Sequence, residues 1–291
     1  MEKMDRSGSA GALERQSEPD ERPTGSRLSS DDLSEVQDRL RLRAAMVYAI
    51  VCREGDEELN RTFRSLWWSG VAAGLSIGFS VVVEGLLRAH LPDAPWRPLI
   101  DNVGYSTGFL IVILARQQLF TENTLTAVLP LIGAPTVHNL FRTLRLWGVV
   151  LAANMVGAAI FGAALSSELF FSDEHQRAFR EISSHFMAYD ASRMFFTGIV
   201  AGWLIATLVW LLPSPETFPA TLIIIITYVI ALGGFAHVIA GSVEAFLLIF
   251  DGTVGLGDAF ATFFLPALAG NIVGGSALFA LLAYAQVREE L

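Results

Sequence analysis

The chain has 291 residues, of which 53% are hydrophobic and 17% are charged, and its mean hydropathy is +0.48. This composition excludes an ordinary soluble domain and predicts a membrane protein. The formal net charge of −9 argues against a basic nucleic-acid-binding surface, and the single cysteine, Cys52, excludes an intramolecular disulfide and a cysteine-rich metal site.

The N-terminal part of the chain is polar. Residues 1–30 have the low hydrophobicity and mixed charge of a disordered cytoplasmic tail, and they lack the apolar region of a cleavable signal peptide. Residues 31–65 are predicted to form a cytoplasmic amphipathic helical segment, because apolar residues recur in it at spacings of three and four. We expect this segment to lie on the membrane, to pack against a neighbouring subunit, or to be a simple surface helix.

Residues 66–287 are predicted to be a transmembrane transporter domain, which leaves residues 288–291 as a C-terminal tail. The first span covers residues 66–83, and Glu84 and Arg88 extend it with side chains that can reach the membrane interface. Glycines at spacing four predict close helix packing in this span. Three further uninterrupted spans are predicted at residues 147–165, 194–212 and 260–287.

The second span is predicted to be broken. It is apolar from residue 103 to residue 120, is interrupted at residues 121–124, and continues as a short apolar half over residues 125–132. Irregular backbone at membrane depth is tolerated only where it is buried in protein or lines a water-filled cavity. This interruption therefore indicates a functional segment.

The fifth span shows the same pattern. Its first half is predicted at residues 220–237 and its second half at residues 243–250, with the break at Gly241 and Ser242. Each group of three spans then has its broken span in the middle, and an odd number of spans places the two groups in opposite orientations. The predicted fold is an all-α integral membrane protein with six transmembrane helices in an inverted 3+3 repeat.

Both termini are predicted to be cytoplasmic. The arginines near the membrane give only a small bias toward this orientation. The long acidic N-terminal segment is easier to leave in the cytoplasm than to move across the bilayer.

His237 is the main candidate for a functional role. An ionisable group among apolar residues at membrane depth is costly, and a pKa of about 6.5 lets a histidine change charge near neutral pH. Facing a narrow pore, His237 can hand a proton to a small anion, whereas its structural alternative is a hydrogen-bonded packing residue. At the other break, Thr121 and Asn123 offer a hydroxyl and an amide, and half-helix ends there can hold an anion.

Arg116, Glu122 and Glu244 are predicted to lie near the same depth. Because an unpaired buried charge costs more than a pair, we expect Arg116 to pair with one of the carboxylates. The functional alternative is that Arg116 attracts anions. The remaining histidines have no metal-ligand spacing and are predicted to be solvated, and the chain has no nucleophile, phosphate-loop or metal motif. We expect no enzymatic activity, no cofactor and no metal.

Several short motifs resemble the formate/nitrite transporter family over residues 66–287, in a divergent branch of that family. They lie, in order, on the second to sixth predicted spans, and the string in the last span is the most specific. The motifs are Leu119-Phe120-Thr121 with Asn123, Trp147 with Asn154 and Gly157, Gly198-Ile199 with Trp210, Gly234-Phe235 with His237 and Ala240, and Pro266 with Gly270-Asn271-Ile272-Val273-Gly274-Gly275.

The resemblance implies a homopentamer in a bacterial inner membrane, with an aquaporin-like protomer. Each protomer would carry its own pore for small monovalent weak-acid anions such as formate, nitrite or hydrosulfide, with protons as a second partner. His237 matches the central histidine of the family and Thr121 the threonine facing it. By their offset from these motifs, Tyr105, Leu119 and Ile230 would form apolar constrictions, with Phe109 near one of them.

The chain departs from the family pattern around both breaks. Arg116, Gln117 and Gln118 precede the first motif, Glu122 replaces a small residue, Ala236 stands in a glutamate position, and Gly202 and Gly241 replace asparagines. The usual vestibule lysine is absent, with only His185 or Arg193 in a position to replace it. We therefore keep two alternatives to the anion transporter: an aquaporin-like pore for a neutral solute, and a membrane scaffold that conducts nothing.

Overall fold

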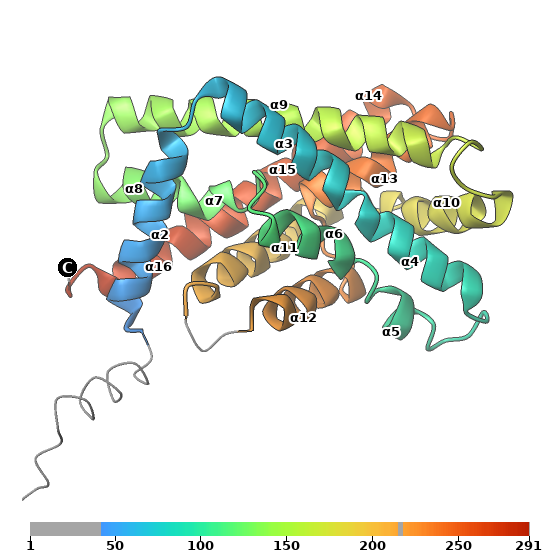
Figure 1. The fold of residues 1–291 in the computed structure, drawn as a ribbon, viewed down its shortest axis with the longest axis horizontal. Helices are drawn as coiled ribbons and strands as arrows, with labels where there is room; N and C mark the ends of the chain where they lie inside the picture. The colour runs from blue at the N-terminus through green and yellow to red at the C-terminus, as the bar shows by residue number, and fades with distance from the viewer. Residues whose placement is uncertain (1–41, 215–217, 291) are drawn as a thin grey trace, which may run out of the picture. The chain divides into compact units, whose positions relative to one another are not determined.

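The computed structural model describes residues 42–214 and 218–290, and within these residues all regular structure is helical (Figure 1). The predicted tail of residues 1–30, and residues 31–41 of the predicted amphipathic segment, lie outside the described residues. The helices are α2 (Ala44–Leu59), α3 (Phe63–Ile77), α4 (Phe79–His90), α5 (Pro98–Asp101), α6 (Ser106–Leu114), α7 (Asn123–Thr126), α8 (Val128–Gly133), α9 (Val137–Leu165), α10 (Asp173–Met187), α11 (Ala191–Leu211), α12 (Pro219–Leu232), α13 (Val238–Phe250), α14 (Leu256–Ala259), α15 (Leu265–Ile272) and α16 (Leu281–Val287), with π-helical stretches at Phe260–Phe264 and Val273–Ala280.

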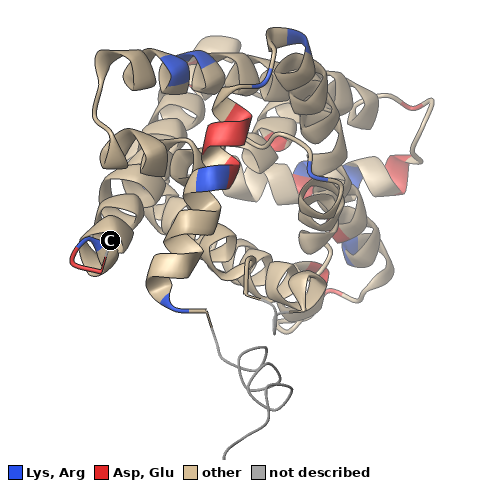
Figure 2. Cartoon of the chain, turned by 60° about the vertical axis from the view of Figure 1, so that its left-hand side comes forward, with Lys and Arg blue, Asp and Glu red and all other residues tan. Residues whose placement is uncertain are grey.

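Among the described residues, four helical segments are long and apolar enough to cross a membrane: Phe63–His90, Val137–Leu165, Ala191–Leu211 and Leu256–Val287. Four shorter apolar segments fall into two consecutive pairs, Pro98–Leu114 with Asn123–Gly133, and Pro219–Leu232 with Val238–Phe250. Figure 2 shows long helical stretches without acidic or basic residues, as expected for helices that face lipid or one another.

The first break covers residues 115–122, so it starts earlier than the predicted interruption at residues 121–124. Helix α6 ends because Arg116 adopts a left-handed conformation with φ of 52°. The amides of Arg116 and Gln117 then donate to the carbonyls of Ile113 (3.1 Å) and Val112 (2.9 Å), which is a Schellman motif. Asn123 is already the first residue of α7.

The second break covers residues 233–237, and the predicted break at Gly241 and Ser242 is wrong because both residues are buried within α13. Helix α12 ends at a second Schellman motif, in which Gly234 has φ of 60°. The amides of Gly234 and Phe235 each donate at 2.9 Å, to the carbonyls of Ala231 and Ile230. A Cβ atom on Gly234 would also lie 2.6 Å from the Tyr189 hydroxyl oxygen. Glycine is required there both by conformation and by space.

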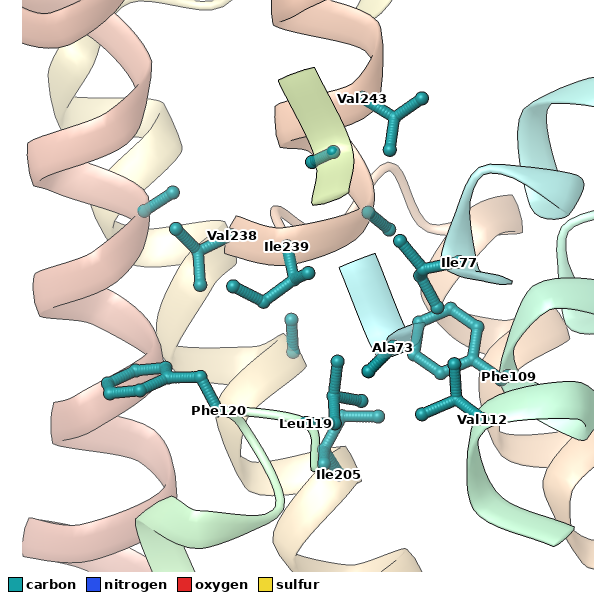
Figure 3. Packing of buried hydrophobic residues seen from close by; sticks show 14 of the residues in the cluster. Ala73, Ile77, Phe109, Val112, Leu119, Phe120, Ile205, Val238, Ile239 and Val243 are labelled. Atoms are coloured by element: carbon teal, nitrogen blue, oxygen red, sulfur yellow. The ribbon is translucent and has the colours of Figure 1, made fainter. Parts of the chain in front are cut away.

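The glycines of the first span allow close packing between α3 and α9. A Cβ atom on Gly74 would overlap the carbonyl oxygen of Asn154 and lie 2.9 Å from the Cα of Gly157. Small residues at such a crossing let two backbones approach closely in a membrane. The approach brings α9 against the first break. Figure 3 shows the apolar core beside it, where Phe109, Leu119 and Val238 belong to one buried cluster.

Two polar segments differ from the simplest sequence-based expectation. Helix α2 is packed on α8 and α16, and Val51 and Leu59 on it are buried, so its described part is neither a free surface helix nor held only by another subunit. Glu84 does not reach the interface, because its side chain is buried, whereas Arg88 forms ion pairs with Asp101 and Glu181. The burial of Glu84 and the ion pair of Arg88 with Glu181 arise because α10 and α13 pack against α4.

Candidate functional site

The two breaks meet at a single polar contact. Nε2 of His237, in the second break, lies 2.8 Å from Oγ1 of Thr121, in the first. Both side chains are fully or almost fully buried. The structure therefore brings together the two residues that the sequence identified at separate interruptions.

The hydrogen bond at Nδ1 of His237 determines which ring nitrogen carries the proton when the ring is neutral. His237 is the N-cap residue of α13, and its Nδ1 accepts a hydrogen bond from the backbone N–H of Ala240 at 3.1 Å. A nitrogen that accepts has no proton, so the neutral ring carries its proton on Nε2 and donates it to Thr121. The hydroxyl hydrogen of Thr121 is then free to donate to another group.

Aromatic rings cover His237 on one side. The Phe109 ring meets the imidazole edge to face with centroids 4.9 Å apart, and Tyr105 lies 5.2 Å from Phe109. Phe109, Leu119 and Ile230 are buried in the same apolar cluster as Tyr105. Of the expected constriction residues, Phe109 meets the imidazole directly, and its ring offers an ion almost no hydrogen bonds.

Two cavities lie at opposite ends of the same helices. The first, of about 440 Å³, is lined by Tyr105, by Arg193 at the start of α11 and by Ile230 near the end of α12. The second, of about 360 Å³, is lined by Ile113 near the end of α6, by Val209 near the end of α11 and by Pro219 at the start of α12. We name them the Glu244 cavity and the Glu122 cavity after an acidic residue in each. His237 and Thr121 line neither cavity, so the structure is closed between them.

The Glu122 cavity is rich in carboxylates. Glu54, Glu57, Glu58 and Glu122 line it together with one arginine, Arg116. Within the described residues Arg116 has no ion pair at 4.0 Å or less, although it acts electrostatically on Glu54. Asn123 lines the same cavity, and its amide nitrogen donates to Oε1 of Gln118 at 3.2 Å, so its side chain does not contact His237.

Arg116 was expected to pair with Glu122 or Glu244, and Glu244 lines the other cavity. Arg116 and Glu122 do share a cavity, without a direct ion pair among the described residues. At the other end, both His185 and Arg193 line the Glu244 cavity, and the Arg193 guanidinium lies 3.7 Å from the centre of the Tyr189 ring.

Three buried residues at the site were not identified as functional from the sequence. Asn154 and Asn271 each make two hydrogen bonds at a break and a third to a neighbouring helix, and Glu84 lines the Glu244 cavity. The signal for the asparagines was a polar amide within an apolar span, which is costly in lipid unless it is bonded. The signal for Glu84 was weaker because it lies close to the predicted end of its span.

Comparisons with known proteins identify relatives of the chain and structures with a similar fold. The sequence model of the family described as formate/nitrite transporter matches residues 45–285. The chain is 42% identical over 274 residues to the inner membrane protein YfdC of Escherichia coli (strain K12), which covers 94% of this chain and 87% of that protein. Its fold is similar to that of an FNT family ion channel, with a TM-score of 0.69, 20% identity and coverage of 84% of this chain and 98% of the other. It is also similar to a pentameric formate channel with formate bound, with a TM-score of 0.65, 19% identity and coverage of 78% and 97%.

Proposed function

Because the chain belongs to the formate/nitrite transporter family, we propose that it forms a pore for small monovalent anions of weak acids. Formate, nitrite and hydrosulfide are the expected class. The observation that carries this proposal is the 2.8 Å contact between His237 and Thr121, which lies between two cavities at opposite ends of the same helices.

The proposed architecture is a homopentamer of six-span protomers in a bacterial inner membrane. The four long helices and the two broken pairs account for six crossings. The matching Schellman motifs at the two breaks support an inverted 3+3 repeat. An even number of crossings places both termini on one side, and the polar N-terminal segment favours the cytoplasm. Since α2 precedes the first crossing and lines the Glu122 cavity, that cavity faces the cytoplasm and the Glu244 cavity faces outward.

Each cavity has one arginine without a close ion pair among the described residues, Arg193 outside and Arg116 inside, and each arginine attracts anions. The anion then meets the buried rings of Tyr105 and Phe109, where it loses water. At the centre, the free hydroxyl hydrogen of Thr121 donates to the anion while His237 holds the hydroxyl oxygen in place. The neutral His237 ring thus donates a hydrogen bond to the Thr121 hydroxyl and orients it.

His237 also supplies a pH gate. A second proton must bind at Nδ1, where the backbone N–H of Ala240 now donates. Two N–H groups cannot share that contact, so protonation forces the ring out of its position at the start of α13. A positive charge there is further disfavoured by the helix dipole.

The test is a flux assay with the full-length protein in proteoliposomes. Formate, nitrite, hydrosulfide, acetate and chloride are offered at two pH values to the wild type and to His237→Asn. We expect weak-acid anions to pass in the wild type with a steep pH dependence that His237→Asn removes. The matched control is His138→Asn, at an exposed residue near the start of α9, which should behave as the wild type. Equal uptake of an uncharged solute by all three proteins, with no anion flux, would indicate a neutral-solute pore, and no uptake at all would indicate a scaffold.

A further inference from the structure

Two carboxylic side chains from different helices line the Glu244 cavity. Glu84 comes from α4 and Glu244 from α13, and they are 7% and 6% exposed. Each lies within electrostatic range of Tyr105, the aromatic residue between this cavity and Phe109. The pair therefore stands at the point where an anion would leave the outer cavity for the constriction.

Neither carboxyl group is neutralised by a direct contact. Among the described residues, Glu84 and Glu244 have no ion pair at 4.0 Å or less, and Oε2 of Glu244 is buried with no hydrogen-bond partner. Arg88, one turn from Glu84, remains within its electrostatic range but is bound at 3.6 Å to Asp101 and at 3.2 Å to Glu181. A buried polar atom that lacks a hydrogen-bond partner calls for an explanation.

Other charged or titratable groups face the pair from every neighbouring element. They are Arg88 on α4, Asp101 on α5, Tyr105 before α6, His185 on α10, Tyr189 before α11 and Arg193 on α11. Arg88 already forms ion pairs with Asp101 and Glu181, and the Arg193 guanidinium lies over the Tyr189 ring. Two ionised carboxylates in such a site would repel each other and lose hydration, whereas one proton between them removes most of that cost.

We propose that Glu84 and Glu244 hold a proton between them and transfer it to the weak-acid anion in the outer cavity, so that the anion passes His237 as the neutral acid. This inference rests on the proposed function. In the transfer, the carboxylic O–H bond of one glutamate breaks and a new O–H bond forms on the anion, or an S–H bond on hydrosulfide. The glutamate is left as a carboxylate and takes its next proton from a hydronium ion of the solution in the cavity, which leaves water and restores the pair.

The geometry at His237 explains why the proton must come from elsewhere. The only proton of the neutral ring lies in the contact with Thr121, and its loss would create an imidazolate anion in an apolar setting. A carboxylic acid is better matched, because it donates to the anion of another weak acid at little energetic cost. Glu84 and Glu244 are the proton-transfer residues in this scheme, and His237 and Thr121 orient the acid that passes.

The first test needs no transport. Infrared spectra of the purified full-length protein at neutral pH should contain the C=O stretching band of a protonated buried carboxylic acid. This band should be lost or shifted in Glu84→Gln and in Glu244→Gln and kept in Glu174→Gln, which changes an exposed glutamate on α10. A wild-type spectrum without such a band, or one in which neither substitution alters it, would overturn the proposal.

The second test measures coupling. Proteoliposomes with a pH-sensitive dye inside receive carbon-14 formate, and proton entry is compared with formate entry. We expect one proton per formate in the wild type and in Glu174→Gln, and at least a tenfold lower rate in Glu84→Gln/Glu244→Gln at neutral pH. Glu244→Asp keeps an acid and should retain most of the rate, which separates proton transfer from misfolding.

The outcomes distinguish this inference from the proposed function. If the wild type carries formate and the double variant carries it at the same rate with the same pH profile, the carboxylate pair has no such role and the pore function stands. If the rate depends on sodium and falls when choline replaces it, the pair is a cation site and the proposal is wrong. If the wild type carries no anion but shows the carboxylic band, the proposed function fails and proton transfer to an anion fails with it.

Discussion

Asn154 and Asn271 hold the two breaks with the same three hydrogen bonds. Oδ1 of Asn154 accepts from the amide of Phe120 at 2.9 Å, and Oδ1 of Asn271 accepts from the amide of Val238 at 2.9 Å. The Nδ2 group of Asn154 donates to the carbonyls of Gln118 and Gly70, each at 2.8 Å. Likewise, Nδ2 of Asn271 donates to Ala236 at 2.7 Å and Gly198 at 2.9 Å. One amide thus satisfies the backbone of each break and ties it to a neighbouring helix.

Replacing Asn271 by alanine should destabilise the protein and stop flux. The change leaves the amide of Val238 and the carbonyls of Ala236 and Gly198 without their partner, and an unsatisfied buried group costs about 1–3 kcal/mol. We expect a clearly lower midpoint of thermal denaturation in detergent. The control is Asn139→Ala on the exposed start of α9, where water replaces the lost bonds. An equal midpoint for the two variants would contradict the role of Asn271.

The left-handed residues at the two breaks should respond in opposite directions. Arg116 has φ of 52°, which costs a non-glycine residue about 1–2 kcal/mol, so Arg116→Gly should raise stability. Gly234 has φ of 60° and lies against the Tyr189 hydroxyl, so Gly234→Ala should lower stability by at least as much. Thermal denaturation checks both signs. Since Arg116→Gly also removes the arginine of the Glu122 cavity, we expect this variant to be more stable and to admit anions more slowly.

Thr121 should require its hydroxyl and tolerate the loss of its methyl group. Thr121→Val keeps the shape but removes both the acceptor for His237 and the donor for the anion, and we expect at least a tenfold loss of flux. Thr121→Ser keeps the hydroxyl and should retain most of the flux. Similar fluxes for the valine and serine variants would show that the hydroxyl has no part in transport.

Nitrogen NMR of labelled histidine can read the tautomer directly. In the wild type at a pH where the ring is neutral, Nε2 of His237 should carry the proton and Nδ1 should have the shift of an unprotonated acceptor. Thr121→Val should change the Nε2 signal and leave the tautomer the same, because Ala240 still donates to Nδ1. Finding the proton on Nδ1 would exclude the proposed gate.

Phe109→Ala should open the constriction beside His237. The ring fills the space against the imidazole at 4.9 Å, and removing a buried phenylalanine costs about 3–5 kcal/mol of stability when the cavity does not collapse. We expect acetate and chloride to pass faster relative to formate than in the wild type. Phe141→Ala, at an exposed residue of α9, is the control and should leave selectivity unchanged. An unchanged ratio in Phe109→Ala would argue against a constriction at this ring.

Several apolar spans were predicted within a few residues, because hydropathy and length are local properties of the chain, but α9 begins at Val137, well before the predicted start of the third span at residue 147. Residues 194–212 became α11, Ala191–Leu211, and the polar stretch that precedes it contains α10, which covers α4 and α13. The second break was misplaced because Gly241 and Ser242 look like helix breakers when considered alone. Within α13, Gly241 fits against Phe186 and Phe263, and the Ser242 hydroxyl donates to the carbonyl of Val238.

Hydropathy and residue spacing were enough to predict a helical membrane protein with two interrupted spans and a histidine beside one interruption. Apolar segments, paired glycines and a single histidine within an apolar segment can be recognised in a sequence without knowing what surrounds them. Three features become visible only in the folded molecule: His237 bonds to Thr121, Asn154 and Asn271 satisfy the breaks, and Glu84 shares a cavity with Glu244. Hydrogen bonding and burial depend on which distant segments are in contact, and the packing of the helices sets these contacts.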